Sequence, residues 1–275
     1  MSSGHTPDAW SSVADAYERQ ASRAFAAGSA VSEWLIDAVE AGPGRTILDL
    51  ASGPGYTSLL AAARGASVIC TDLSSSMLDV ARRRAAEQGL DGIEFRLADA
   101  QDLDLLDASV DGVVCRYGVM LMPDLSAVLA EAHRVLRPSG SFAYAVWGPS
   151  ERNVWASLIR SAAEDNGHQP EGDPLGPGGM MSLADPARNV NAARSAGFGE
   201  VTVETLTLPV RFDSFEEYWT LRREASVSTQ NLLAALSEDE VASLRGTAER
   251  MAADHRRPDG ALVFDSMTLV VRAIR

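Results

Sequence analysis

The stretch Ile47-Leu48-Asp49-Leu50-Ala51-Ser52-Gly53-Pro54-Gly55-Tyr56 joins an apolar run to a glycine turn and the start of a helical pattern. The apolar run, residues 46–50, has the length and composition of a buried strand, and the helical pattern covers residues 56–64. This order places backbone N–H groups and a helix N-terminus at the carboxyl end of the strand, where a small ligand can bind. Gly53 and Gly55 let the backbone approach that ligand closely. A nucleotide-like ligand is therefore the first hypothesis.

The next apolar run, residues 67–71, ends in Asp72 and predicts a second strand with an acid at its tip. An acid there can accept hydrogen bonds from both hydroxyls of a ribose. The dinucleotide fingerprint needs a third glycine, but this chain has Ser58 at that position. Asp49, just before the turn, would repel a pyrophosphate and suits an ammonium group. S-adenosylmethionine carries an ammonium and no phosphate, so it is favoured over a dinucleotide.

Five motifs, in order along residues 46–147, resemble those of the class I S-adenosylmethionine-dependent methyltransferases. They are Asp49-Leu50-Ala51-Ser52-Gly53-Pro54-Gly55, Asp72, Leu97-Ala98-Asp99-Ala100, Asp111-Gly112-Val113-Val114-Cys115-Arg116-Tyr117 and Glu131-Ala132-His133-Arg134-Val135-Leu136-Arg137-Pro138-Ser139-Gly140. One glycine loop alone is a weak signal, whereas the ordered set is specific. The chain looks closest to the small-molecule branch around ubiquinone/menaquinone-type and natural-product methyltransferases. It departs from the commoner pattern at Ala51 and Ser139, where glycine is usual.

The resemblance implies a binding site for S-adenosylmethionine at the strand tips. The residues implied to bind it are Asp49, Ala51, Gly53, Gly55, Asp72, Leu73, Met77, Ala98, Asp99, Ala100, Arg116 and Tyr17. Asp72 corresponds to the ribose-binding acid, and Asp99 to the acid that binds the adenine amino group. Packing in the core is an equally good interpretation for Met77.

The catalytic residues are harder to read, because methyl transfer from a sulfonium mainly needs alignment and exclusion of water. Tyr17, on an N-terminal helix, and Tyr117, after the fourth strand, are candidates, and each could instead be a packed aromatic. His168, in a Pro/Gly-rich segment, is the best candidate for a general base among the histidines. No Cys/His cluster has metal-ligand spacing, so no metal is expected.

The composition limits the classes of partner. The formal net charge is −14, which disfavours nucleic acid and anionic membrane surfaces. The chain has no lysine, which excludes Schiff-base chemistry. No long apolar run predicts a membrane span, and the first residues do not read as a signal peptide. Cys70 and Cys115 lie in expected strands, so free thiols and a cytoplasmic location are expected, with a homodimer left open.

Strands alternating with helices predict an α/β fold, a Rossmann-like doubly wound seven-stranded sheet with a helical cap. The strands are expected at about 46–50, 67–71, 93–97, 110–116, 141–147, 200–208 and 263–272. The sheet is expected to be mostly parallel, and the resemblance implies that the last strand is reversed. The chain is interpreted as one domain, residues 1–275. Its parts are an N-terminal helical cap at 1–44, a cofactor-binding core at 45–148, and substrate-cap insertions at 149–190 and 209–260.

The cap insertions carry the expected acceptor site. Residues 167–181 are rich in glycine and proline and are interpreted as a mobile lid. Phe215, Tyr218, Trp219 and Arg222 have the spacing of one buried helix face, which packs either on the acceptor or in a core.

The function favoured by the sequence is S-adenosylmethionine-dependent O- or C-methylation of a small, largely apolar molecule, with a role in secondary metabolism. One alternative is a protein that binds the same cofactor but catalyses a non-methylating step such as cyclisation. Transfer of a labelled methyl group separates these two. The other alternative is a nicotinamide-dependent oxidoreductase, which a comparison of S-adenosylmethionine with NAD in thermal stabilisation would decide.

Overall fold

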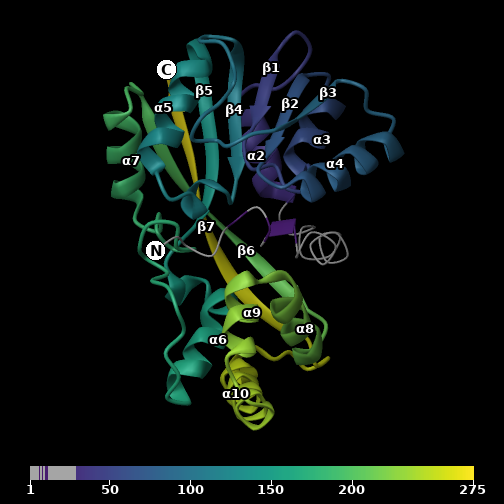
Figure 1. The fold of residues 1–275 in the computed structure, drawn as a ribbon, viewed down its shortest axis with the longest axis vertical. Helices are drawn as coiled ribbons and strands as arrows, with labels where there is room; N and C mark the ends of the chain where they lie inside the picture. Colours follow the sequence, from purple (N-terminus) through teal and green to yellow (C-terminus); the bar gives the residue numbers. More distant parts are fainter. Residues whose placement is uncertain (1–5, 7, 9, 12–28) are drawn as a thin grey trace.

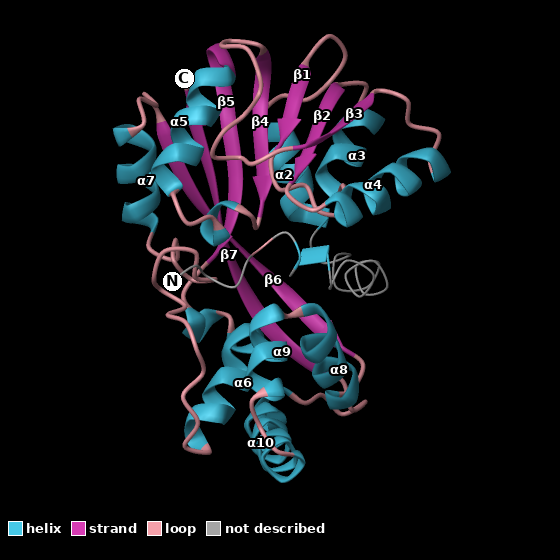
Figure 2. Ribbon diagram, in the orientation of Figure 1, coloured by secondary structure: helices cyan, strands magenta, loops and turns pink. Residues whose placement is uncertain are grey.

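The structure is a computed structural model, and it describes residues 6, 8, 10, 11 and 29–275. A seven-stranded sheet in the order β3-β2-β1-β4-β5-β7-β6 runs through it (Figures 1 and 2). The strands are β1 (Thr46–Asp49), β2 (Ser67–Asp72), β3 (Ile93–Leu97), β4 (Val110–Arg116), β5 (Leu136–Trp147), β6 (Val201–Phe212) and β7 (Leu262–Ile274). Strands β1 to β5 are parallel, and β7 is antiparallel to both neighbours. The predicted fold class, with its reversed last strand, is confirmed.

Helices cover both faces of the parallel part of the sheet, because alternate strand residues bury opposite faces. One face packs against α2 (Ser29–Ala38), α3 (Tyr56–Ala63) and α4 (Ser75–Glu87), and Ile47 lies in this cluster. The other face packs against α5 (Leu125–Val135) and α7 (Pro186–Ser195), and Leu48 lies there. Two apolar layers therefore fix β1, and with it the glycine turn that follows.

The hairpin β6–β7 extends beyond the end of its neighbouring strand β5. β5 pairs with β7 as far as the pair Trp147 and Thr268, whereas β6 and β7 stay paired to Phe212 and Leu262. Figure 1 shows this extension leaving the sheet and carrying a separate helical part, the cap. The cap helices are α6 (Val154–Asp165), α8 (Phe215–Ala225), α9 (Val227–Ala234) and α10 (Glu238–Met251), which enclose a core of their own.

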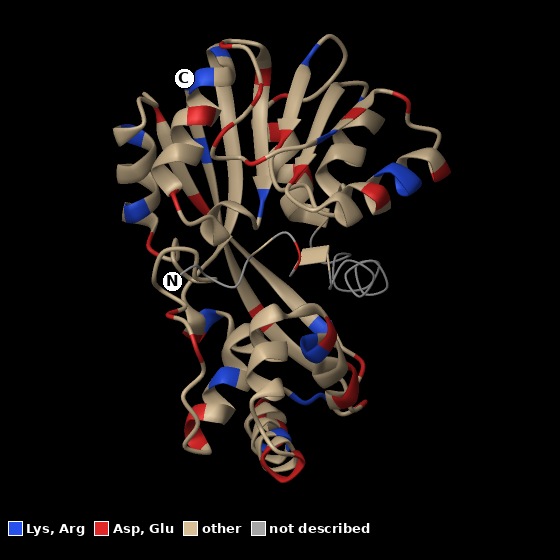
Figure 3. Cartoon of the chain, viewed as in Figure 1, with Lys and Arg blue, Asp and Glu red and all other residues tan. Residues whose placement is uncertain are grey.

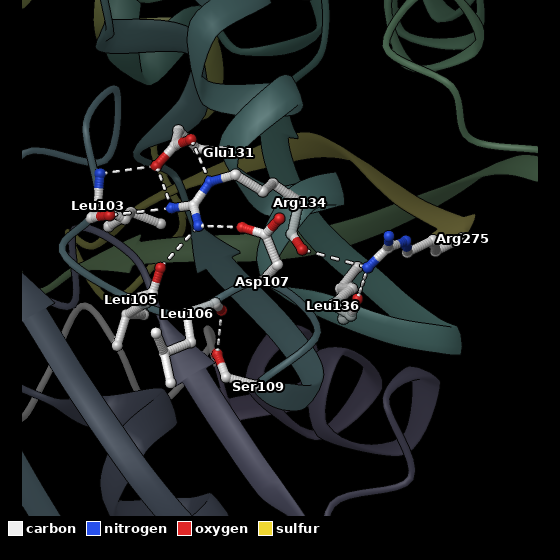
Figure 4. Close-up of polar contacts among 9 residues, drawn as sticks. All are labelled: Leu103, Leu105, Leu106, Asp107, Ser109, Glu131, Arg134, Leu136 and Arg275. Atoms are coloured by element: carbon white, nitrogen blue, oxygen red, sulfur yellow. Dashed lines mark hydrogen bonds and ion pairs between the residues drawn. The ribbon is translucent and has the colours of Figure 1, made fainter.

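Arg134 ties the loop between β3 and β4 to α5 (Figure 4). Its guanidinium donates hydrogen bonds to Glu131 and Asp107 and to the backbone oxygens of Leu103 and Leu105. The same Glu131 carboxylate accepts from the Leu103 N–H at 2.7 Å. This is the Glu-x-x-Arg part of the fifth motif, and its contacts give it a structural role. These contacts hold the loop 98–109, which contains Asp99, against α5.

Charged residues are spread over both the sheet and the cap, with acids and arginines interspersed (Figure 3). Residues 82–84 are three consecutive arginines. The first of them, Arg82, forms an exposed ion pair with Asp79 and lies over the ring of Phe95. Among the described residues, no helix is both long enough and apolar enough to cross a bilayer.

Candidate functional site

The carboxyl ends of β1 and β2 meet at the glycine turn, as predicted. The N–H of Gly53 donates to Asp72 Oδ2 at 2.8 Å, and the N–H of Ser74 donates to Asp72 Oδ1 at 2.9 Å. Burial raises the pKa of Asp72, and the two backbone bonds oppose that effect. A carboxylate has about four acceptor positions. Asp72 can therefore bind two further hydroxyl groups while it holds the turn in place.

Asp49 is the most unusual acid of the site, because it is buried with one oxygen unsatisfied. It is 1% exposed, and its Oδ2 accepts a hydrogen bond from the Ser58 hydroxyl at 2.7 Å. Its Oδ1 has no partner among the described residues. Burial raises the pKa of Asp49 to about 7, while the nearby positive charge of Arg116 lowers it by less. Buried polar atoms are seldom left unpaired, because the loss of hydration is then not compensated. A cationic group that donates a hydrogen bond to Asp49 Oδ1 would supply that compensation.

The two predicted ligand-binding glycines have different surroundings. Gly53 has a φ of +53°, and a Cβ there would have no atom within 4 Å, so space is open above it. Gly55 has a φ of +79°, and its Cβ would lie 2.9 Å from the Cβ of Ala81 on α4. Close packing against α4 therefore explains Gly55 without a ligand. Gly53 is the glycine beside which a ligand has room.

Ala51, a departure from the glycine that the family resemblance leads one to expect, adopts a φ of +49°. This left-handed conformation is costly for a residue with a Cβ. The Ala51 methyl group fills the place that a side chain at residue 118 would need, since a Cβ on Gly118 would lie 2.8 Å from it. Ala51 thus packs against the start of the segment after β4 and makes glycine necessary there.

The predicted adenine-binding residues lie around the end of β2. Leu73 is an exposed apolar residue, and the Ala98 N–H donates to the Asp72 backbone oxygen at 3.0 Å. The Asp99 carboxylate accepts from the Gln101 N–H at 2.9 Å and from the Gln101 amide. Ala100 is buried beside them. The structure therefore brings the residues of the second and third motifs together.

Met77 connects the site to the rest of the chain. It is 3% exposed, and Trp10 and Val227 pack against it. The hydroxyl of Ser11 lies 3.0 Å from that of Ser74, the N-cap of α4. Because Val227 begins α9, the cap and the N-terminal segment both reach the start of α4. Tyr17, predicted to lie over the cofactor, is outside the described residues.

Arg116 and Arg84 flank the ring of Tyr56, the first residue of α3. The guanidinium of Arg84 lies 3.8 Å from the ring centroid and donates to the Pro54 backbone oxygen at 3.0 Å. Arg116 lies 4.9 Å from the same ring and donates to Ser32 at 3.0 Å. Arg84 of α4 therefore supports the glycine turn from the side of Tyr56.

Tyr117 also has a left-handed backbone, with a φ of +59°. Its hydroxyl lies 2.8 Å from Thr268 Oγ1, and its ring stacks on Trp147 with centroids 3.9 Å apart. Burial raises the pKa of Tyr117 to about 12. The phenol is therefore neutral and tied to β7, which does not suit the role of a base.

His168 is not brought to the strand tips. It follows the far end of α6, where its backbone N–H donates to the Ala163 oxygen at 2.9 Å. It lies near Glu240 of α10, whose pKa is lowered mainly by hydrogen bonds with Ser237 and only to a smaller extent by His168. The prediction of His168 as the base is therefore wrong on position. His133 packs against Phe198 and His255 against Phe264, both away from the turn.

The aromatic stripe of α8 lies in the core of the cap. Phe215, Tyr218 and Trp219 are all nearly inaccessible, and the Tyr218 hydroxyl donates to the Trp155 backbone oxygen at 3.0 Å. Of the two readings of this stripe, the structure supports core packing.

The segment that precedes α7 covers the residues after β4. The Ser182 hydroxyl donates to the Met120 backbone oxygen at 2.8 Å. A cavity of about 190 Å³ lies between the two segments, lined by Met120, Met122, Pro177 and Gly178 among others. In the described residues no group of three or more His, Cys, Asp or Glu could hold a metal ion.

Comparisons with known proteins agree with this geometry. A family model described as a methyltransferase domain matches residues 47–140. An uncharacterised protein of Mycobacterium tuberculosis is 42% identical over 113 residues, which cover 41% of this chain and 41% of that protein. A ubiquinone/menaquinone biosynthesis C-methyltransferase of Acidiphilium cryptum is 49% identical over 102 residues, covering 36% of this chain and 41% of that enzyme. The chain thus spans about two fifths of these relatives.

Solved structures share the fold over most of the chain. The YcgJ protein of Bacillus subtilis has a TM-score of 0.62 at 17% identity, covering 89% of this chain and 97% of that one. The geranyl diphosphate C-methyltransferase of Streptomyces coelicolor, in complex with Mg²⁺, geranyl diphosphate and S-adenosyl-L-homocysteine, has a TM-score of 0.53 at 20% identity. It covers 90% of this chain and 79% of that one.

Proposed function

Since residues 47–140 form a methyltransferase domain of the class I S-adenosylmethionine-dependent type, we propose that the chain transfers a methyl group to a small, largely apolar organic acceptor, by O- or C-methylation. The observation that carries the proposal is the buried Asp49 carboxylate, whose Oδ1 lacks a partner, beside the open space at Gly53. The ammonium of S-adenosylmethionine is a suitable partner for this oxygen, and a pyrophosphate is not.

The residues present fit this cofactor. Asp49 would receive the ammonium, with Ala51, Gly53 and Gly55 supplying the backbone around the methionine end. Asp72 would bind the ribose hydroxyls. The groups proposed around the adenine are Leu73, Met77, Ala98, Asp99 and Ala100, and Arg116 would lie beside the carboxylate end. When bound, the cofactor supplies an activated methyl group.

The chain's own part in the reaction is to align the acceptor and exclude water. With the cofactor bound, the acceptor atom would form a bond to the methyl carbon as the carbon–sulfur bond breaks, and the electron pair of that bond would stay on sulfur. Any proton on the acceptor is then released to solvent or to a base. No histidine of the described residues lies at the ends of β1, β2 or β4. A nucleophile that needs no histidine base, such as an activated carbon or a phenolate, fits best.

The acceptor is proposed to lie where the cap meets the end of β4. Tyr117 and Trp147 offer stacked rings there, and the segment at 177–183 closes over Met120. The likeness to a methyltransferase named for ubiquinone and menaquinone supports an apolar ring as acceptor. A role in secondary metabolism, a cytoplasmic location and a homodimer remain predictions from the sequence.

Two measurements test the proposal. Calorimetric titration of the full chain with S-adenosylhomocysteine should give one-site binding, which Asp49→Asn weakens and the exposed-site control Asp165→Asn does not. Incubation with methyl-labelled S-adenosylmethionine and a panel of quinols and phenols should then transfer label. Absence of binding by folded protein would refute the cofactor site. Binding without transfer to any acceptor would favour the non-methylating alternative.

A further inference from the structure

Arg222 of α8 is a buried cation without a counter-ion among the residues that the structure describes. It is 8% exposed, and no carboxylate of the described residues lies within ion-pair distance. Its Nε is buried and has no hydrogen-bond partner within residues 29–275 or the four other described positions. One terminal nitrogen donates long bonds to the Ala156 backbone oxygen at 3.3 Å and to the Ser226 hydroxyl at 3.4 Å. Burying a charge without pairing it is costly, and a guanidinium has five donors to satisfy.

The N-terminus of α9 lies beside this guanidinium. Ser226 is the N-cap of α9 and accepts from the Thr229 N–H at 3.3 Å. A helix N-terminus carries a partial positive charge and favours anions. Ser226 and Ser228 also place two hydroxyls 3.1 Å apart at this point. Two positive features therefore converge where no acid of the described part of the chain forms an ion pair with Arg222.

This corner of the cap is continuous with the proposed methyl-transfer site. Val227, next to Ser226, packs on Met77 of α4. On the other side, the Arg222 guanidinium lies 5.5 Å from the Trp155 ring, and Trp155 meets the edge of Trp147 with centroids 5.2 Å apart. Trp147 in turn stacks on Tyr117. A row of three aromatic rings thus runs from the end of β4 to Arg222.

We propose that Arg222 and the N-terminus of α9 bind an anionic group of the acceptor, a carboxylate or a phosphate, while its apolar body lies along Trp155 and Trp147. The acceptor would then be an apolar molecule that carries an acidic group, and not a neutral molecule. The identification of this ligand as the methyl acceptor rests on the proposed function, whereas the anion site itself does not. A bidentate pair with an arginine is the strongest form of such a contact.

The test is calorimetric titration of the full chain, saturated with S-adenosylhomocysteine, with three probes. They are trans-cinnamate, its neutral methyl ester and phenyl phosphate, so that the two anions distinguish carboxylate from phosphate. One anion is expected to bind at least about tenfold more tightly than the ester, the scale for a charged hydrogen bond. Arg222→Met should remove that difference, and Arg223→Met, its exposed neighbour on α8, should leave it intact.

Arg222→Lys and Arg222→Gln provide the second pair, in case the methionine variant does not fold. The lysine variant keeps the charge and should retain part of the preference for the anion, whereas the glutamine variant should lose it. Equal binding of anions and ester by the wild type, or an unchanged preference in the methionine or glutamine variant, would overturn the proposal. If S-adenosylhomocysteine fails to bind but the anion preference depends on Arg222, the anion site stands and the proposed function fails.

Discussion

Asp49→Asn should raise the free energy of unfolding of the ligand-free protein near neutral pH. It should also remove the part of the pH dependence of stability that comes from Asp49. The pKa of Asp49 rises from 3.8 to about 7 on folding because the carboxyl is buried. Between about pH 4 and pH 7 the native state therefore keeps a proton that the unfolded chain has released, so wild-type stability falls as the pH rises through this window. Each pH unit is worth about 1.4 kcal/mol. The ionised carboxylate thus costs the native state on the order of 4 kcal/mol at about pH 8, a cost that asparagine avoids while it still accepts from Ser58.

The assay is urea unfolding of the free proteins at several values between about pH 5 and pH 8, with Asp165→Asn as the exposed control. The stability of Asp49→Asn relative to wild type should grow with pH, and the control should follow wild type. In parallel, S-adenosylhomocysteine should bind Asp49→Asn about 10- to 100-fold more weakly, since a charged hydrogen bond is lost. Its affinity for the wild type should fall below pH 7, because Asp49 must lose its proton to receive an ammonium. Parallel stability curves for wild type and Asp49→Asn would refute the reasoning.

Asp72→Asn should weaken S-adenosylhomocysteine binding by roughly 1.5–3 kcal/mol in calorimetry, because the amide nitrogen cannot accept from a ribose hydroxyl; unchanged affinity would place the ribose elsewhere. Gly118→Ala should destabilise the protein by about 1–3 kcal/mol through its clash with Ala51, and adding Ala51→Gly should recover part of this in thermal melts; simple additivity of the two changes would contradict the packing described. Arg134→Met should cost about 2–3 kcal/mol in urea unfolding, since it leaves Glu131 and two carbonyls without their donor; a loss of a few tenths would show that the network is weakly coupled. Residues 167–181 should exchange amide hydrogens rapidly in the free protein and slowly once cofactor and acceptor are bound; high protection in the free protein would end the lid hypothesis.

The sequence predicted the parallel part of the sheet closely, because each buried strand is a short apolar run between turn residues. The ends of two strands were missed for local reasons. β5 begins at Leu136, before Pro138 and Gly140, because Leu136 pairs with Val110 across an irregularity. β6 continues through Pro209, a residue that usually ends a strand. Proline is tolerated there because β6 is the edge strand of the sheet.

The candidate site was predictable where its residues sit at strand ends. Asp49, Asp72 and Gly53 meet because topology brings the ends of neighbouring parallel strands together. The support from Arg84 and Thr268 was not predictable, because it depends on how a helix and a distant antiparallel strand pack against the turn. The position of His168 was misjudged for the same reason. A Pro/Gly-rich segment has no period from which its direction can be read. Here it begins at the end of α6 in the cap, where His168 lies, and only later returns to Met120.

β7 is one uninterrupted strand whose two ends belong to different hydrophobic cores. Leu269 and Val271 pack within the sheet's layers, whereas Leu262 and Phe264 pack within the cap. Its ladder with β6 runs across the boundary from Ala273 to Leu262 without a gap. A rigid-body rotation of the cap relative to the sheet would bend or break this ladder. The hairpin therefore resists a hinge motion between the sheet and the cap. Entry of an acceptor and release of its product must then come from movement of shorter segments. The continuous hairpin keeps the distance between the methyl-transfer site and the far side of the cap constant, which limits the length of the acceptor.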